Sequence, residues 1–235
     1  MSEYCLFCHE ELIEHISWST FFSKREEELV CPSCQEQLEE ITGKRCDICS
    51  RPLERIDAQY VVGTRCSDCV RWENDSEWQG YLAGNLSIYL YNDFLKEIIS
   101  QFKFRGDYIL AKVFAQKLKA SIRTLRTDYL VPIPLSTERQ FERGFNQAEA
   151  FLREAGLHST HLLQRTHGEK QSKKSREDRI HLPQIFQLND SFAISGKRIL
   201  LIDDIYTTGS TLRHAAKLLK KAGAGDVFAL TLARS

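Results

Sequence analysis

No stretch of this 235-residue chain is both long and apolar enough to cross a membrane, and the opening MSEYCLFCHE does not resemble a signal peptide. These absences predict a cytoplasmic protein without membrane insertion. Net charge is also lacking, because 32 Lys and Arg balance 32 Asp and Glu. The balance is uneven along the chain: residues 1–80 carry 8 basic and 17 acidic side chains, and residues 81–235 carry 24 and 15. The positive second part suits partners that carry phosphate.

A Walker A loop, G-x-x-x-x-G-K-[ST], is absent, which argues against ATP hydrolysis by this chain alone. Cysteine is absent after residue 69, yet eight cysteines precede that point. They form Cys-x-x-Cys pairs, a spacing that in a cytosolic protein indicates zinc rather than disulfides. The pairs are Cys5/Cys8, Cys31/Cys34, Cys46/Cys49 and Cys66/Cys69.

Four such pairs predict two structural Zn²⁺ sites, each with four thiolate ligands, in a double zinc ribbon. In a sequential arrangement the first two pairs share one ion and the last two share the other. A cross-braced arrangement, which joins the first pair to the third, uses the same residues, so the sequence leaves both open, and we favour the simpler sequential one. A module of this kind takes much of its folding free energy from metal, typically about 10–16 kcal/mol per site in finger peptides. We predict this module over residues 1–78 and a second domain over residues 79–235.

The second domain alternates apolar strands with segments of helical spacing, which predicts an α/β fold with a mainly parallel central sheet. Strands are predicted over residues 86–91, 129–134 and 199–202. Helices are predicted over residues 94–104, about 108–122, and 212–221. Gly106 follows the first of these helices, where a glycine is favoured as a C-terminal cap.

The most informative segment is residues 198–211, RILLIDDIYTTGST. A buried strand runs into two adjacent carboxylates, Asp203 and Asp204, at the edge where ligands of parallel sheets bind. The turn that follows offers hydroxyls and the free N–H groups of a helix N-terminus, which favour a phosphate. Carboxylates repel phosphate but suit vicinal hydroxyls, so the pattern predicts a sugar-phosphate pocket. Its phosphate side comprises Tyr206, Thr207, Thr208, Gly209, Ser210 and Thr211.

This segment resembles the phosphoribosyl pyrophosphate (PRPP) motif of type I phosphoribosyltransferases. The resemblance implies that Asp203 and Asp204 contact the ribose hydroxyls and act in catalysis, that the turn binds the 5′-phosphate, and that Mg²⁺ accompanies PRPP. Arg139 and Arg143, just past the predicted strand 129–134, would hold the pyrophosphate, because planar guanidinium groups match its oxygens.

A narrower resemblance covers nearly the whole chain. The Cys pairs and then the motifs KFRGD, VPIPL, RGFNQ, LLIDDIYTTGST and AGAGDVFALTLAR follow one another as they do in the ComF family. That family joins a zinc module to a phosphoribosyltransferase-like domain and acts in the uptake of transforming single-stranded DNA. The resemblance implies single-stranded DNA, PRPP and a helicase-like ATPase of the ComFA type as partners. This chain departs from the family pattern at Asp178 and His181, where Arg and Asn are usual, although Arg176 and Arg179 lie close enough to substitute.

The polar, aperiodic residues 165–179 supply basic side chains that suit a DNA backbone, whose binding would weaken with salt. The candidates for DNA contact are Lys173, Lys174, Arg176 and Arg179. Aromatic side chains that would either stack on bases or belong to the core are Phe102, Phe104, Phe141 and Phe145.

The sequence thus favours a competence factor that works with a helicase-like ATPase and keeps the PRPP site as a sensor or scaffold. An alternative is a catalytic phosphoribosyltransferase that acts on a nucleobase or a DNA-derived acceptor, although neither a general base nor a base pocket is evident. A further alternative is a zinc-ribbon adaptor with a vestigial pocket, which the intact acids and hydroxyl turn disfavour.

Overall fold

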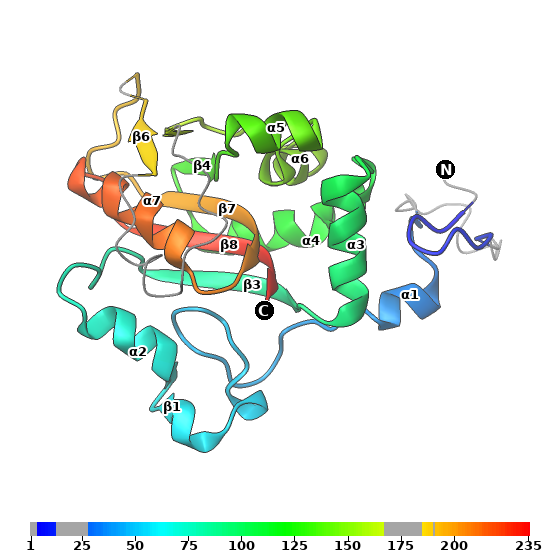
Figure 1. Cartoon of the computed structure of the whole chain (residues 1–235), viewed down its shortest axis with the longest axis horizontal. Helices are drawn as coiled ribbons and strands as arrows, with labels where there is room; N and C mark the ends of the chain where they lie inside the picture. Colours follow the sequence, from blue (N-terminus) through cyan, green and yellow to red (C-terminus); the bar gives the residue numbers. More distant parts are fainter. Residues whose placement is uncertain (1–3, 13–27, 167–184, 190) are drawn as a thin grey trace.

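A parallel sheet of four strands, in the order β3-β8-β7-β4, forms the centre of the protein (Figure 1). The strands are β3 (Gly84–Leu90), β4 (Tyr129–Pro132), β7 (Ile199–Tyr206) and β8 (Val227–Arg234). All of its pairings are parallel. The computed structural model describes residues 4–12, 28–166, 185–189 and 191–235. It confirms the predicted α/β class with a mainly parallel sheet.

Helices cover both faces of the sheet, which explains why the first four residues of β7 are fully buried. The helices are α3 (Asp93–Phe104), α4 (Leu110–Leu125), α5 (Thr137–Arg143), α6 (Gln147–Glu154) and α7 (Ser210–Lys221). Alternate β7 residues belong to different cores: Leu200 and Ile202 pack with α3, α4 and α6, whereas Ile199 and Leu201 pack with α7. Two layers of helix therefore enclose the sheet.

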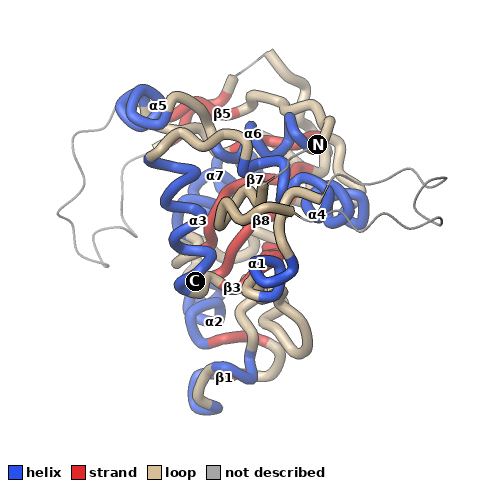
Figure 2. Tube along the Cα trace, turned by 90° about the vertical axis from the view of Figure 1, so that its right-hand side faces the viewer, coloured by secondary structure: helices blue, strands red, loops and turns tan. Residues whose placement is uncertain are grey.

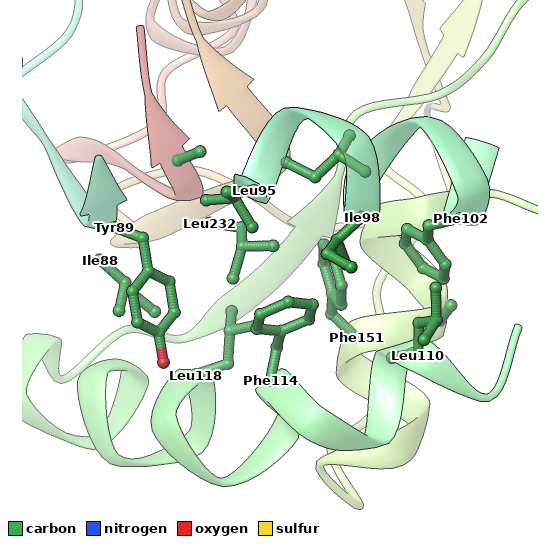
Figure 3. Close-up of a cluster of buried hydrophobic side chains, with 14 of the residues drawn as sticks. Ile88, Tyr89, Leu95, Ile98, Phe102, Leu110, Phe114, Leu118, Phe151 and Leu232 are labelled. Carbon is green, nitrogen blue, oxygen red and sulfur yellow. The ribbon is translucent and has the colours of Figure 1, made fainter. Parts of the chain in front are cut away.

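Aromatic side chains fill the core between the sheet and helices α3 and α4 (Figure 3). The Phe102 and Phe151 rings stack with centroids 5.2 Å apart, and Phe114 meets Phe151 edge-on at 6.1 Å. Leu95 of α3 and Leu232 of β8 point into the same cluster. Burial at helical spacing on α3 confirms the amphipathic helix predicted there.

Local signals set the ends of the helices and strands near the predicted positions. The Asn92 side chain accepts the Leu95 N–H at 2.9 Å and starts α3, and Gly106, with φ of +75°, follows its end. Helix α4 runs three residues beyond the predicted end, to Leu125, and β4 stops two residues early, at Pro132. Strand β7 is longer than predicted, because it continues through the two acids to Tyr206.

The amino-terminal third consists of short elements around the cysteines. They are α1 (Pro32–Glu36), two 3₁₀ turns (Leu53–Arg55 and Ala58–Tyr60), β1 (Val61–Val62), β2 (Arg65–Cys66) and α2 (Ser67–Asn74). The first cysteine group, with α1, lies beside α3, whereas β1 and α2 lie at the end of the molecule away from α5 (Figures 1 and 2). The boundary after residue 78 stays a prediction, and Trp78 itself packs against His214 of α7, with ring centroids 4.6 Å apart.

Strands β5 (Leu163–Arg165) and β6 (Phe186–Leu188) form a separate antiparallel pair. The chain between them, residues 167–184, lies outside the described residues, so the structure gives no position for the DNA-contact candidates. These are Lys173, Lys174, Arg176 and Arg179. In the part of the chain that is described, no helix has the length and apolar character that a membrane span requires.

Candidate functional site

Asp203 and Asp204 lie in the last half of β7, beyond the fully buried apolar residues of that strand. The Asp204 N–H donates to Asp203 Oδ1 at 2.9 Å, which holds the first carboxylate in place. Burial and the neighbouring Asp204 carboxylate raise the pKa of Asp203 to about 7. The pair therefore forms a half-buried acidic centre, and a cation or hydroxyl donors would stabilise its negative charge.

Lys103, in the last turn of α3, provides the nearest positive charge. Its Nζ lies 2.6 Å from Asp204 Oδ2, and only 14% and 13% of the two side chains are exposed. In the sequence, KFRGD indicates only a helix end, so the contact of Lys103 with Asp204 is not predicted. The helical spacing places Lys103 on the face next to the buried Phe102, but nothing local points it toward β7.

Two arginines also lie near the acids. The negative charge of Asp203 acts to raise the pKa of both Arg143 and Arg165, and the positive charge of Arg139 acts to lower it. Burial lowers the pKa of Arg143 and of Arg165, so their charges are held in partly desolvated surroundings where an anion would interact strongly. The structure thus brings the predicted Arg143 to the acids and adds Arg165, whereas the predicted Arg139 is exposed and lies near these two arginines.

The RGFNQ motif explains how Arg143 is held. Gly144 takes φ of +76° and ends α5, and the Asn146 side chain caps α6 by accepting the Ala148 N–H at 2.9 Å. Arg143 Nη1 then donates to Gln147 Oε1 at 2.7 Å. Gly144, Asn146 and Gln147 therefore serve to hold the guanidinium group of Arg143 in place.

The hydroxyl turn leads from β7 directly into α7, a helix of 12 residues. Thr207 and Thr208 are exposed, and Gly209 takes φ of +77° as the residue before the helix. The Thr208 hydroxyl accepts the Ser210 N–H at 3.4 Å. Exposed hydroxyls and N–H groups at the positive end of a helix dipole suit an anion. We name residues 207–211 the phosphate turn, after the ligand that the sequence predicts for it.

Tyr206 differs from its neighbours in the predicted phosphate site. Its ring is 2% exposed and lies beneath the turn, where its hydroxyl accepts a hydrogen bond from Arg213 Nη1 at 2.7 Å. A methyl group on Gly209 would collide with that hydroxyl. Tyr206 supports the phosphate turn from below and does not face a ligand through its side chain.

The cysteines gather into two groups of four, each with all sulfur atoms within 4.8 Å of one another. One group is Cys5, Cys8, Cys31 and Cys34, and the other is Cys46, Cys49, Cys66 and Cys69. This is the sequential arrangement of the pairs. All eight are free cysteines without a disulfide.

The two groups share one local design. The N–H groups of Cys5 and Cys46 each donate to the carbonyl five residues later, at 2.8 Å in both cases. The residues after each first pair, His9 and Ser50, take left-handed φ values of +62° and +58°. This tight turn directs both sulfurs of a Cys-x-x-Cys pair to one point.

In each group the second pair begins a helix. Cys31 precedes α1 and Cys66 precedes α2, and the fourth cysteine lies in the first turn. Backbone N–H groups of Cys31 and Cys66 point at Sγ of Cys5 and Cys46, at 3.3 and 3.4 Å. Such N–H contacts and the helix dipole favour thiolates, and four thiolates fit a closed tetrahedral Zn²⁺ site.

A family model for the phosphoribosyl transferase domain matches residues 143–234, which include the phosphate turn and both acids. Among curated proteins, the chain is 40% identical to competence protein ComFC of Bacillus subtilis (strain 168), covering 98% of this chain and 95% of that protein. It is 33% identical to competence protein ComFC of Streptococcus pneumoniae (strain ATCC BAA-255 / R6), covering 98% and 99%. It is 28% identical to competence protein F of Haemophilus influenzae, covering 88% and 90%.

Solved structures with a partial likeness include the allosteric regulatory enzyme of purine biosynthesis, with 18% identity and a TM-score of 0.36, covering 52% of this chain and 25% of that one. A hypoxanthine phosphoribosyltransferase from Staphylococcus aureus has 19% identity and a TM-score of 0.34, covering 53% and 63%.

Proposed function

The chain belongs to the ComFC family of competence proteins, and on that premise we propose that it is a competence factor for the uptake of transforming single-stranded DNA that carries a PRPP-binding site. The observation that carries the proposal is the meeting of unlike groups at one edge of the sheet. Two half-buried carboxylates near the end of β7 are followed closely by the phosphate turn, and arginines from α5 and β5 lie close enough for the charge of Asp203 to act on them. PRPP needs this combination, because it joins ribose hydroxyls to phosphate groups.

Each part of PRPP has a matching group in this assignment. Asp203 and Asp204 accept hydrogen bonds from the ribose hydroxyls and favour positive charge that develops at the reacting carbon. The phosphate turn holds the 5′-phosphate. Arg139 and Arg143 hold the pyrophosphate, and Arg165 joins them. Carboxylate oxygens also suit Mg²⁺, which when bound with PRPP would neutralise pyrophosphate charge.

The pKa of Asp203 adds a pH dependence to this site. Because that pKa is about 7 in the free protein, the carboxyl carries a proton in part of the molecules at neutral pH. Mg²⁺ and PRPP binding favours the ionised form and releases that proton. Binding should therefore tighten as pH rises through about 7.

Calorimetric titration of PRPP with Mg²⁺ into the purified protein tests the assignment. We expect micromolar binding, lost in the double variant Asp203→Asn, Asp204→Asn and kept in the surface variant Asp226→Asn. Absence of binding to the wild-type protein would contradict a PRPP site and favour the adaptor with a vestigial pocket. Unchanged binding by the double variant would place the ligand elsewhere.

Two exposed rings near the arginines support the single-stranded DNA part of the proposal. Phe104 is 69% exposed and Phe141 is 91% exposed, whereas Phe102 is core at 1%. The Arg143 guanidinium carbon lies 5.6 Å from the centre of the Phe104 ring. Exposed rings beside arginines offer stacking for bases and charge for phosphates.

The rings can be tested one at a time. Phe141→Ala should weaken binding of a labelled oligo-dT by about tenfold in fluorescence anisotropy, because stacking on one base contributes about 1–3 kcal/mol. Its PRPP titration should not change, since the ring lies on the outside of α5. Phe192→Ala, at another exposed ring, is the control. Equal loss in both variants would remove α5 from the DNA surface.

The helicase-like ATPase of the ComFA type is proposed as a partner on family membership alone. Co-purification from competent cells and a gene deletion test it together. Loss of transformation without loss of DNA binding at the cell surface supports a role in uptake, and unchanged transformation would contradict it.

Catalysis is a second candidate, favoured by an acid pair and arginines that would stabilise a departing pyrophosphate. Release of pyrophosphate from PRPP with a nucleobase or DNA acceptor is the measurement. No release with any acceptor, together with tight PRPP binding, would favour a sensor or scaffold.

A further inference from the structure

Helix α2, which carries Cys69 of the second cysteine group, touches the phosphate turn directly. Trp72 Nε1 donates to the backbone carbonyl of Thr208 at 3.2 Å across 136 residues of sequence. Thr208 lies in the middle of the turn and is otherwise exposed. One side chain of the metal-binding segment thus holds the backbone of the predicted 5′-phosphate site.

A second link runs beneath the turn through Arg213 of α7, which is 0% exposed. Its Nη1 donates to the Tyr206 hydroxyl, its Nη2 lies 3.5 Å from Glu73 Oε1, and its guanidinium carbon lies 4.9 Å from the Trp72 ring centre. A buried arginine is costly without a partner charge. Glu73, the next residue of α2, supplies that charge from outside the sheet domain.

A third link reaches the sulfur cluster itself. Arg234, at the end of β8 and 4% exposed, donates from Nη1 to the Tyr206 carbonyl at 3.2 Å and from Nη2 to Cys49 Sγ at 3.7 Å. A cavity of about 180 Å³ lies between these parts, lined by Cys49, Cys69, Trp72, Thr207 and Thr208 among others. Sulfur ligands and the phosphate turn therefore share one small space.

The first cysteine group has no such connection in the described part of the chain. It packs through Phe7 against Phe94 and Phe114, with ring centroids 5.7 and 6.0 Å apart, on the core of α3 and α4. The two metal groups are alike in local design but lie against different cores. The chain thereby provides its own control.

We propose that Trp72, Glu73 and Arg213 are positioning residues of the phosphate turn, and that metal at the second cysteine group alone is required to keep that turn ready for a phosphate. Metal fixes Cys66 and Cys69 and so fixes α2. Helix α2 then holds the Thr208 carbonyl and supplies the charge that keeps Arg213 under Tyr206. This inference rests on the proposed function, because the ligand of the turn is taken to be the 5′-phosphate of PRPP.

The test compares Trp72→Phe with Trp78→Phe in the full zinc-loaded chain. Both remove an indole N–H from the same segment, but Trp78 Nε1 is buried without a hydrogen-bond partner among the described residues. Hydrogen exchange measured by mass spectrometry should show faster exchange of the amides of residues 207–211 in Trp72→Phe only. Affinity for ribose 5-phosphate should fall about fivefold in that variant, the effect of one net hydrogen bond. Affinity for magnesium pyrophosphate should stay unchanged, which a general loss of structure would not allow.

Cysteine variants test the metal part. Cys69→Ser should loosen the phosphate turn in the same exchange measurement, and Cys34→Ser, at the equivalent position of the first group, should not. Unchanged exchange at 207–211 in Trp72→Phe, or equal loosening in Trp78→Phe or Cys34→Ser, would overturn the proposal. If the wild-type protein binds neither ribose 5-phosphate nor PRPP, the proposed function fails, and the exchange comparison still decides this inference.

Discussion

Replacement of Asp203 by asparagine should stabilise the protein at neutral and alkaline pH. The native structure raises the pKa of Asp203 from an ordinary value near 3.8 to about 7, first through burial and then through Asp204. The native state therefore holds this proton more tightly than the unfolded chain, and stability falls as pH rises from about 4 to about 7. A shift of this size corresponds to about 4 kcal/mol at full ionisation, at 1.36 kcal/mol per pKa unit.

Asparagine keeps the shape of the protonated acid and can still accept the Asp204 N–H through Oδ1. Urea unfolding of wild-type and Asp203→Asn proteins, with zinc and without PRPP, measures the difference in unfolding free energy. That difference should favour the variant and grow by about 2 kcal/mol between pH 5.5 and 8.5, since about half of the total effect lies below pH 5.5.

Asp204→Asn is the matched control. It leaves the partly buried Lys103 ammonium without its carboxylate partner, so we expect it to destabilise the protein by about 1–3 kcal/mol. Two results would refute the raised pKa of Asp203. One is a difference in unfolding free energy between wild type and Asp203→Asn that does not vary with pH. The other is an Asp203→Asn variant that is less stable than wild type at pH 8.

Other expected outcomes follow from single features. Cys31→Ser should release about one zinc per chain, because a four-thiolate site loses a ligand; atomic absorption that finds the full zinc content would contradict the assignment. Gly209→Ala should lower stability by more than about 1 kcal/mol, since φ of +77° and the Tyr206 hydroxyl leave no room for a Cβ; a variant with wild-type melting temperature would show that the turn adapts. Lys173→Ala with Lys174→Ala should reduce the slope of log affinity for DNA against log salt by up to about two units; an unchanged slope would exclude both lysines from phosphate contact.

The two halves of β7 differ in burial, which explains how the strand tolerates two acids. The first half of β7 is buried on both faces and anchors the strand, so its last half can carry two carboxylates at modest exposure. The ammonium group of Lys103 then balances the negative charge of Asp204. The folding free energy that the raised pKa of Asp203 costs is thus offset by the apolar core beside it.

Local chemistry was predictable from the sequence alone. Cys-x-x-Cys spacing specifies a sulfur pair within one turn, and an apolar run that ends in acids, hydroxyls and glycine specifies a strand that leads through a turn into a helix. These patterns depend on neighbours a few residues apart, which backbone geometry fixes regardless of the rest of the chain. The parallel sheet followed from the same alternation of strand and helix.

Contacts between distant residues were decided only by the tertiary structure. Lys103 meets Asp204 across 101 residues, and Trp72 meets Thr208 across 136. Phe102 and Phe104 differ by two positions, yet one is core and the other is exposed, because helix α3 turns only one of them toward the sheet. The choice of the sequential cysteine groups belongs here too. No local pattern encodes such contacts, since they arise from how whole elements pack to bury apolar surface.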